Sequence, residues 1–202
     1  MNLIHRVNPF AALREMWRGN PDLRYADRHR AETMLAVHGL VTCEHFRKGN
    51  LIHTQTGPNT FTTEGMARIL NIVFRAQTTD AAIYCGIFKN NVTPAVGNTA
   101  AACLGAAGTY GECQDADYDD PATNKPAYTM ASTTTAVATN AASKATFVMN
   151  ASITVYGAFL STATAKTATT GTLFCAKAFS ASRAVIADDE LAVTYVLTLT
   201  TS

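Results

Sequence analysis

The stretch ELAVTYVLTLT, residues 190–200, decides the fold class of this chain. Large apolar side chains alternate in it with small or polar ones, and this two-residue period is typical of a β-strand that turns one face toward a core. The pair Asp188-Asp189 just before it predicts a turn. We therefore predict a strand at residues 190–200. Its apolar side comprises Leu191, Val193, Tyr195, Leu197 and Leu199, and its other side Ala192, Thr194, Val196, Thr198 and Thr200.

Three further stretches predict strands. Residues 81–89 (AAIYCGIFK) carry apolar side chains on both faces, as expected of a strand buried on both sides. Residues 145–160 alternate from Phe147 to Val155, and Gly157 then predicts a bulge or bend. Residues 173–179 favour one more strand.

One amphipathic helix is expected after Thr62 or Thr63, either of which can cap it. Glu64 lies in the first turn, where a negative charge suits the helix dipole. We expect this helix to bury one face firmly against the sheet. Its apolar residues follow at steps of three and four: Met66, Ile69, Leu70, Val73 and Phe74.

Several short strands with one helix favour a mainly β fold, an antiparallel β-sandwich of jelly-roll-like type. Residues 1–46 are expected to form an extended N-terminal arm, with short helices at residues 9–17 and 27–38. Residues 47–202 are expected to form the sandwich domain. Residues 90–128 are rich in Gly, Ala, Asn, Asp and Pro, and predict a long loop excursion with little regular structure.

The composition argues against several classes of partner. The net charge is +1 and charged residues are 15% of the chain, so no global field attracts specific nucleic acid or a membrane. A surface of Thr, Ala and Ser with few charges is typical of proteins whose neighbours in an assembly cover them. The five cysteines form no C-x-x-C pair, which predicts free buried thiols in a protein made in a reducing cytoplasm.

The motifs of common enzymes are missing from the sequence. There is no G-x-S-x-G elbow, phosphate-binding loop or dinucleotide fingerprint. The histidines lie in the first quarter of the chain without metalloprotease spacing. We therefore expect no enzymatic activity, no cofactor and no small-molecule substrate.

A weak candidate for a cation site is the D-x-D-x-D run of Asp115, Asp117 and Asp119. A calcium loop would carry Gly at its sixth position and Glu at its twelfth, where this chain has Asp120 and Pro126. The favoured interpretation is a solvated loop, or a partner for an arginine of a neighbouring subunit.

The arm carries the candidate interface residues: Phe10, Leu13, Trp17, Arg24 and Arg28. Aromatic, aliphatic and arginine side chains are the types that anchor protein interfaces. Interspersed Glu and Asp residues dilute the positive charge, so we expect contact with a protein surface.

The order of four segments resembles small virion structural proteins of tailed bacteriophages. These segments are TTEGMARILNIVF (62–74), IYCGIFK (83–89), SITVYGAFLST (152–162) and LFCAKAFSASRAVIADDELAVTYVLTLT (173–200). The resemblance implies a non-enzymatic component of the virion, assembled in the host cytoplasm. A capsid cement or decoration protein would bind the major capsid protein and copies of itself, whereas a tail, neck or fibre-attachment protein would form a ring or trimer around the tail axis.

A non-viral ligand- or carbohydrate-binding β-sandwich is the second alternative. It expects exposed aromatic side chains in the loops, and its candidates are Tyr110, Tyr118 and Tyr128.

Overall fold

Two antiparallel β-sheets dominate the structure, a computed structural model that describes residues 35–130 and 134–201. Strands contain 47% and helices 10% of the described residues, which confirms the mainly β, sandwich-type prediction. The jelly-roll connectivity stays a prediction. Residues 37–199 form one compact unit, which contains both sheets and both described helices.

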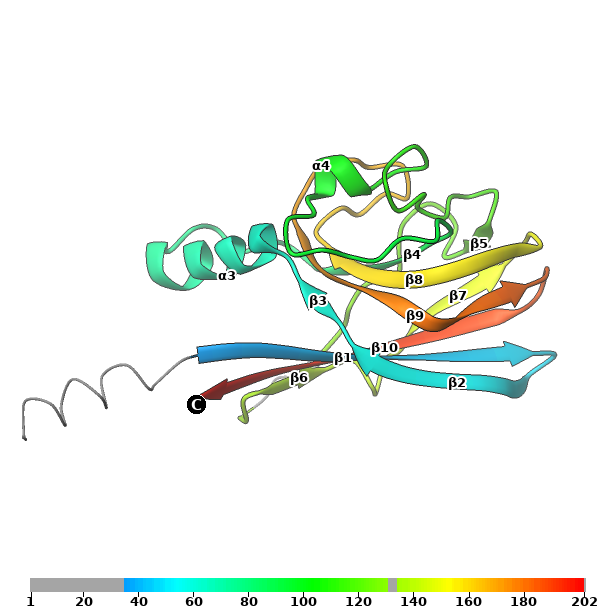
Figure 1. Cartoon of the computed structure of the whole chain (residues 1–202), viewed down its shortest axis with the longest axis horizontal. Helices are drawn as coiled ribbons and strands as arrows, with labels where there is room; N and C mark the ends of the chain where they lie inside the picture. Colours follow the sequence, from blue (N-terminus) through cyan, green and yellow to red (C-terminus); the bar gives the residue numbers. More distant parts are fainter. Residues whose placement is uncertain (1–34, 131–133, 202) are drawn as a thin grey trace, which may run out of the picture. The chain divides into compact units, whose positions relative to one another are not determined.

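Figure 1 shows the two sheets as stacked layers. Sheet A has the order β2 (Asn50–Pro58), β1 (Leu35–Arg47), β10 (Glu190–Thr201), β7 (Ala145–Met149), β5 (Tyr118–Asp120), and β6 (Val137–Thr139) also pairs with β10. Sheet B has the order β3 (Thr60–Phe61), β9 (Leu173–Val185), β8 (Ile153–Ser161), β4 (Tyr84–Phe88). The described helices are α3 (Thr63–Arg75) and α4 (Ala100–Cys103).

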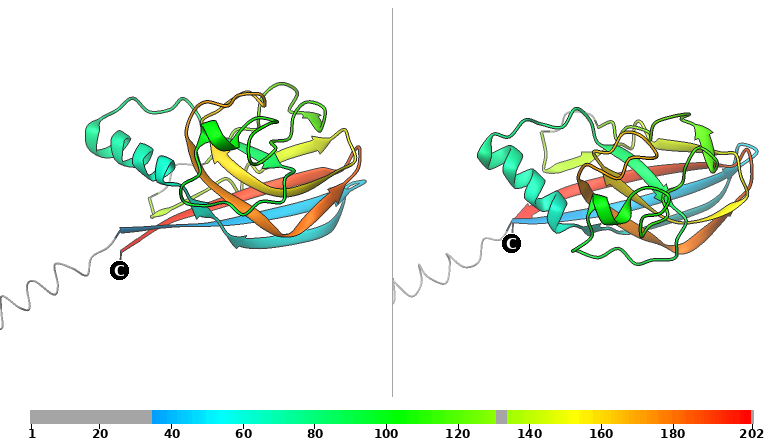
Figure 2. Two further views of the ribbon diagram at one scale, coloured as in Figure 1. Left: turned by 45° about the horizontal axis from the view of Figure 1, so that its top comes forward. Right: turned by 90° about the horizontal axis from the view of Figure 1, so that it is seen from above.

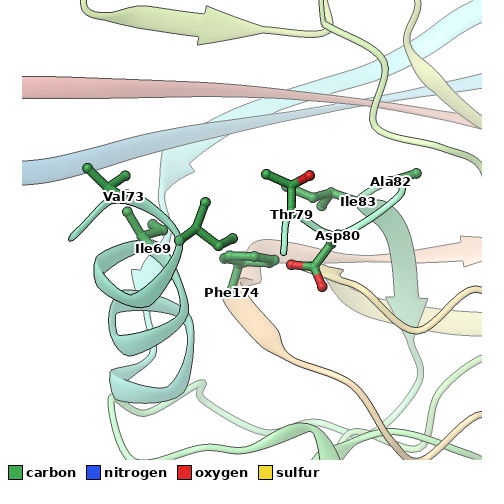
Figure 3. Close-up of a pocket in the computed structure, with 8 residues that line it drawn as sticks. Ile69, Val73, Thr79, Asp80, Ala82, Ile83 and Phe174 are labelled. Atoms are coloured by element: carbon green, nitrogen blue, oxygen red, sulfur yellow. The ribbon is translucent and has the colours of Figure 1, made fainter. Parts of the chain in front are cut away.

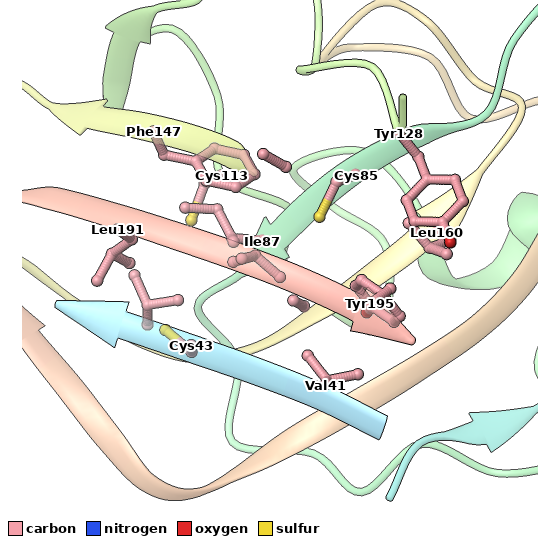
Figure 4. Close-up of a cluster of buried hydrophobic side chains, with 14 of the residues drawn as sticks. Val41, Cys43, Cys85, Ile87, Cys113, Tyr128, Phe147, Leu160, Leu191 and Tyr195 are labelled. Carbon is pink, nitrogen blue, oxygen red and sulfur yellow. The ribbon is translucent and has the colours of Figure 1, made fainter. Parts of the chain in front are cut away.

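The main core lies between the sheets (Figure 4). The predicted inward face of β10 is confirmed for Leu191, Val193 and Tyr195, which are fully buried. The five cysteines are free and buried, as predicted. Burial raises the pKa of the Cys43 thiol to about 12, so it stays protonated at neutral pH. These thiols therefore serve as small apolar side chains.

Sheet B is buried on its other face as well. There Phe88 and Phe159 pack against Tyr110 and Leu104, which belong to the excursion at residues 90–128. The excursion contains only α4 and β5 as regular elements, close to the expectation, but it is not a loose loop. Its first half, residues 90–110, forms a third layer on sheet B, whereas Cys113 and Tyr118 join the main core and β5 pairs in sheet A. The prediction that residues 81–89 contain a strand buried on both sides is confirmed by β4.

The C-terminal boundary predicted for the arm, residue 46, is too late, because β1 already begins at Leu35. Residues 35–46, assigned to the arm with a helix reaching His38, form most of β1 inside sheet A. Val41, Cys43 and His45 are buried in alternation, and the signal is weak because two of these buried positions hold a small cysteine and a polar histidine. The rest of the arm, with the helix expected at residues 9–17, lies outside the described residues.

The single strand expected over residues 145–160 is two strands in different sheets. β7 belongs to sheet A and β8 to sheet B, and residues 150–152 connect them. The alternation continues across the break because both strands turn residues toward the same core. The bulge predicted at Gly157 is confirmed by a shift in the β8–β9 register between Val155 and Gly157.

A buried carboxylate fixes the turn that precedes β10. Asp189 accepts hydrogen bonds from His45 Nε2 (2.9 Å), from Arg47 Nε (2.9 Å) and Nη2 (2.7 Å), and from the backbone N–H of Ile186 (2.9 Å). The bond from Arg47 is the main reason why the pKa of Asp189 lies well below its usual range. The cluster ties β1 to the β9–β10 turn.

Gly157 allows sheet B to pack closely. A Cβ atom there would lie 2.2 Å from the Phe88 ring and 2.3 Å from the Lys177 carbonyl oxygen. We expect Gly157→Ala to lower the free energy of unfolding, measured in urea, by about 2–3 kcal/mol. The new methyl group would displace the backbone of β9 at Lys177, which its sheet hydrogen bonds hold in place. Gly97→Ala is the matched control, since a Cβ at Gly97 meets no atom within 4 Å. Equal effects of the two substitutions would contradict the close packing.

Candidate interaction surface

Helix α3 is anchored at its N-terminal end. Thr62 caps the helix by accepting the Gly65 N–H (3.0 Å), and its hydroxyl donates to the Leu173 carbonyl oxygen. Glu64 accepts the backbone N–H groups of Ala100 (2.9 Å) and Leu173 (2.7 Å). A Cβ at Gly65 would lie 2.5 Å from the Phe174 backbone, so the first turn lies directly on β9.

The segment after α3 is also fixed. Arg68 forms a two-pronged ion pair with Asp80, with Nε–Oδ2 and Nη2–Oδ1 distances of 2.9 Å. The same guanidinium donates to Gln77 Oε1 and to the Thr78 carbonyl oxygen, each at 2.7 Å. Paired, planar hydrogen bonds of this kind hold geometry well. Helix α3 is therefore anchored on the sandwich through its first turn, and the segment that follows it is tied back to the middle of the helix.

The expectation that α3 buries its apolar face is wrong for the outward half of that face. Leu70, Val73 and Phe74 are 53%, 64% and 74% exposed. The apolar residues of α3 extend around more than half of the helix, but the sandwich contacts only the side that includes Gly65 and Ile69. Figures 1 and 2 show α3 extending away from the sheets beyond its first turn.

Two apolar grooves lie where α3 meets the sandwich, and the first of them reaches the exposed side chain of Val73. The first has a volume of about 280 Å³, and Figure 3 shows Ile69, Val73, Ile83 and Phe174 around it. The second has a volume of about 240 Å³. Ile69 lines both grooves, so they adjoin at this side chain. We call Leu70, Val73 and Phe74 with the two grooves the α3 surface. The second groove is lined by Val37, Phe61, Ile69, Val137, Leu197 and Leu199, among others.

The interface residues predicted from sequence all lie outside the described part of the chain. These are Phe10, Leu13, Trp17, Arg24 and Arg28. The α3 surface was missed by the sequence reasoning because the pattern was interpreted as a core face. The signal that could have revealed it is the width of the apolar arc, which exceeds what one contact with a sheet can bury.

The acidic run does not gather into a cation site. Asp117 is buried and binds Lys89 Nζ at 2.7 and 2.9 Å and the Gln114 N–H at 2.8 Å. Asp115 lies 3.1 Å from Lys166 Nζ, and Asp119 is exposed. Among the described residues, no group of three or more His, Cys, Asp or Glu side chains could hold a metal ion.

The three tyrosines expected to be exposed are core residues. Tyr110 and Tyr118 are 1% exposed and Tyr128 is 7% exposed. Tyr110 stacks on Phe88 with ring centroids 4.8 Å apart, and Tyr118 meets Phe147 edge to face at 5.1 Å. They therefore offer no stacking platform for a sugar ring.

Two lysines of the Ala- and Thr-rich segments are buried, which the sequence reasoning missed. Lys125 Nζ lies 2.7 Å from both Glu112 Oε1 and the Ala165 carbonyl oxygen. Burial lowers the pKa of Lys125 and raises that of Glu112, while their pairing opposes both shifts. Lys166 Nζ donates to the Tyr118 carbonyl oxygen at 2.7 Å and lies over the Tyr118 ring. Both lysines fasten the excursion to residues 165–166.

Comparisons of the chain with protein-family models, with curated proteins and with solved structures found no match. In the ranges 35–130 and 134–201, no helix is long and apolar enough to cross a membrane.

We expect Lys125→Met to lower the free energy of unfolding by about 3–5 kcal/mol, because it leaves the Glu112 carboxylate buried without its cation. Denaturant titration of the purified chain measures this loss. The double variant Lys125→Met/Glu112→Gln should recover part of it, since the amide oxygen can still accept the Gly105 N–H. The control is Lys144→Met, which removes an exposed pair with Glu44 and should cost less than about 1 kcal/mol. A loss in Lys125→Met no larger than in this control would contradict the role of the buried pair.

Proposed function

We propose that this chain is a structural component of a bacteriophage particle, most specifically a capsid cement or decoration protein. In this role it binds the shell of the major capsid protein and neighbouring copies of itself. The observation that carries the proposal is the α3 surface, an apolar face held rigidly at the outside of a β-sandwich. The sequence resemblance to virion structural proteins is the reason for proposing that the partner belongs to a bacteriophage particle.

The rigid anchoring of α3 supports an interface. An exposed apolar helix on a loose segment could fold back onto the sheet, but Thr62 fixes the first turn of α3 and Arg68 ties the middle of the helix to residues 77–80. Covering the exposed parts of Leu70, Val73 and Phe74 gains on the order of 1–2 kcal/mol for each side chain. That gain is comparable to a small interface hot spot, so a neighbour that covers α3 contributes real affinity.

The polar surface fits the same role. The edge strand β2 exposes Thr54 and Thr56 rather than charged side chains. Uncharged side chains lose less hydration energy on contact with another protein than lysine or glutamate do. A chain with this surface can lie against a large protein shell with little cost of desolvation.

Copy number distinguishes the proposed role from its alternatives. Quantitative mass spectrometry of purified particles should find this chain in the hundreds, near parity with the major capsid protein. A dozen copies or so would favour the tail, neck or fibre-attachment role. Absence from the particle would overturn the proposal and favour a ligand-binding module, whose ligand would then have to use the apolar grooves.

Phe74→Asp tests the α3 surface within the particle. We expect this variant to fold normally, because the side chain is already 74% exposed, and to be incorporated at least about tenfold less than the wild type. The readout is the ratio of this chain to capsid protein in purified particles. Leu51→Asp, at a 52% exposed position of the β1–β2 hairpin, is the control and should be incorporated normally. Normal incorporation of Phe74→Asp would remove the α3 surface from the assembly contact.

A further inference from the structure

The α3 surface needs a second partner beyond the sandwich. Leu70, Val73 and Phe74 form a ridge at steps of three and four residues, the pattern that packs against the side chains of another helix. The two grooves that Ile69 lines provide room for large apolar side chains. Within the described ranges, nothing covers the outer parts of these three side chains.

A segment with the matching pattern is present in the same chain. PFAALREMW, residues 9–17, places Phe10, Leu13, Met16 and Trp17 at helical spacing. Pro9 suits the first position of a helix, and Gly19 suits its end. The sequence therefore predicts a short amphipathic helix whose apolar stripe also needs a partner, since so short a helix is not stable alone in water.

The tether between the segment and the sandwich has sufficient length. From Trp17 to Leu35 there are 35 − 17 = 18 residues, which reach at most about 60 Å when extended. Val37, two residues further on, lines the second groove. The segment is thus attached at the edge of an α3 surface by a tether of up to about 60 Å.

We propose that the α3 surface binds the segment Pro9–Trp17 of a second copy of this chain. This proposal rests on the proposed function, which places many copies side by side, so that each α3 surface has the segments of neighbouring copies within reach. Exchange covers both apolar stripes of every copy, whereas pairing of two α3 helices would leave Phe10, Leu13 and Trp17 uncovered. Each copy supplies one donor and one acceptor, so the contact closes as a reciprocal pair or as a ring.

Two variants of the full-length chain separate donor from acceptor. Leu13→Asp disables the donor segment, and Phe74→Asp disables the acceptor surface. Light scattering of the wild type at rising concentration should show association to pairs or rings. Each variant alone should associate at least about tenfold more weakly, while Leu51→Asp should behave as the wild type.

Mixing the two variants gives the decisive measurement. The intact segment of Phe74→Asp can bind the intact α3 surface of Leu13→Asp, so an equimolar mixture should form pairs that neither variant forms alone. Trp17 is the only tryptophan of the chain, so its fluorescence reports directly on the donor segment. Its emission should shift to shorter wavelength on mixing, as the ring leaves water.

Three results would overturn the proposal. Association of Leu13→Asp at wild-type strength, with loss only in Phe74→Asp, would mean that α3 pairs with α3. A monomeric wild type with shielded Trp17 at every concentration would mean that the segment binds within its own chain. A monomeric wild type with Trp17 in water would mean that no such contact forms. None of these removes the proposed function, which depends on the separate measurement of the chain in particles.

Discussion

Sheet B must be covered on both faces, and the other parts of the chain are arranged to meet this constraint. Its strands carry apolar residues in both directions, as Ile87 and Phe88 do in β4. Sheet A covers one face, and the excursion at residues 90–128 has to cover the other. Because the excursion has little regular structure, its backbone groups pair through scattered bonds, such as those from Cys113 to Ile87 and from Tyr128 to Ile83 in or beside β4, and not through one continuous ladder. Buried ion pairs and side-chain hydrogen bonds supplement these backbone bonds.

Lys125, Glu112 and Lys166 show how these interactions work. Each is a charged residue in the interior, and each bonds to a backbone group or to an opposite charge. Such groups contribute less to net stability than an apolar core would, but they tolerate very few alternative arrangements. The excursion is therefore held in one position over sheet B. The same logic applies to Asp189, which fixes the turn between β9 and β10 through three neighbours.

The sequence predicts those parts of the fold whose pattern is local. Strand β10 and helix α3 have strong periods, and the caps and turns at Thr62 and Asp188 are signalled by their residue types. Strand β1 was missed because His45 is buried through a hydrogen bond to Asp189, a partner distant in sequence. The exposure of Phe74 was missed as well, because the spacing of apolar residues is the same in a buried and an exposed face, and only the width of the apolar arc of α3 indicates that part of it stays uncovered. Burial of Lys125 depends on Glu112 and Ala165, which only the fold brings together.

The burial of the five thiols has a practical consequence. Because burial keeps Cys43 and the other cysteines protonated and out of contact with solvent, the folded chain presents no native thiol to a maleimide reagent. A cysteine introduced on the surface would thus be labelled alone, without first removing the natural ones. The protein can carry a dye or spin label at a chosen position while its core stays intact, and distances between copies become measurable inside an assembly.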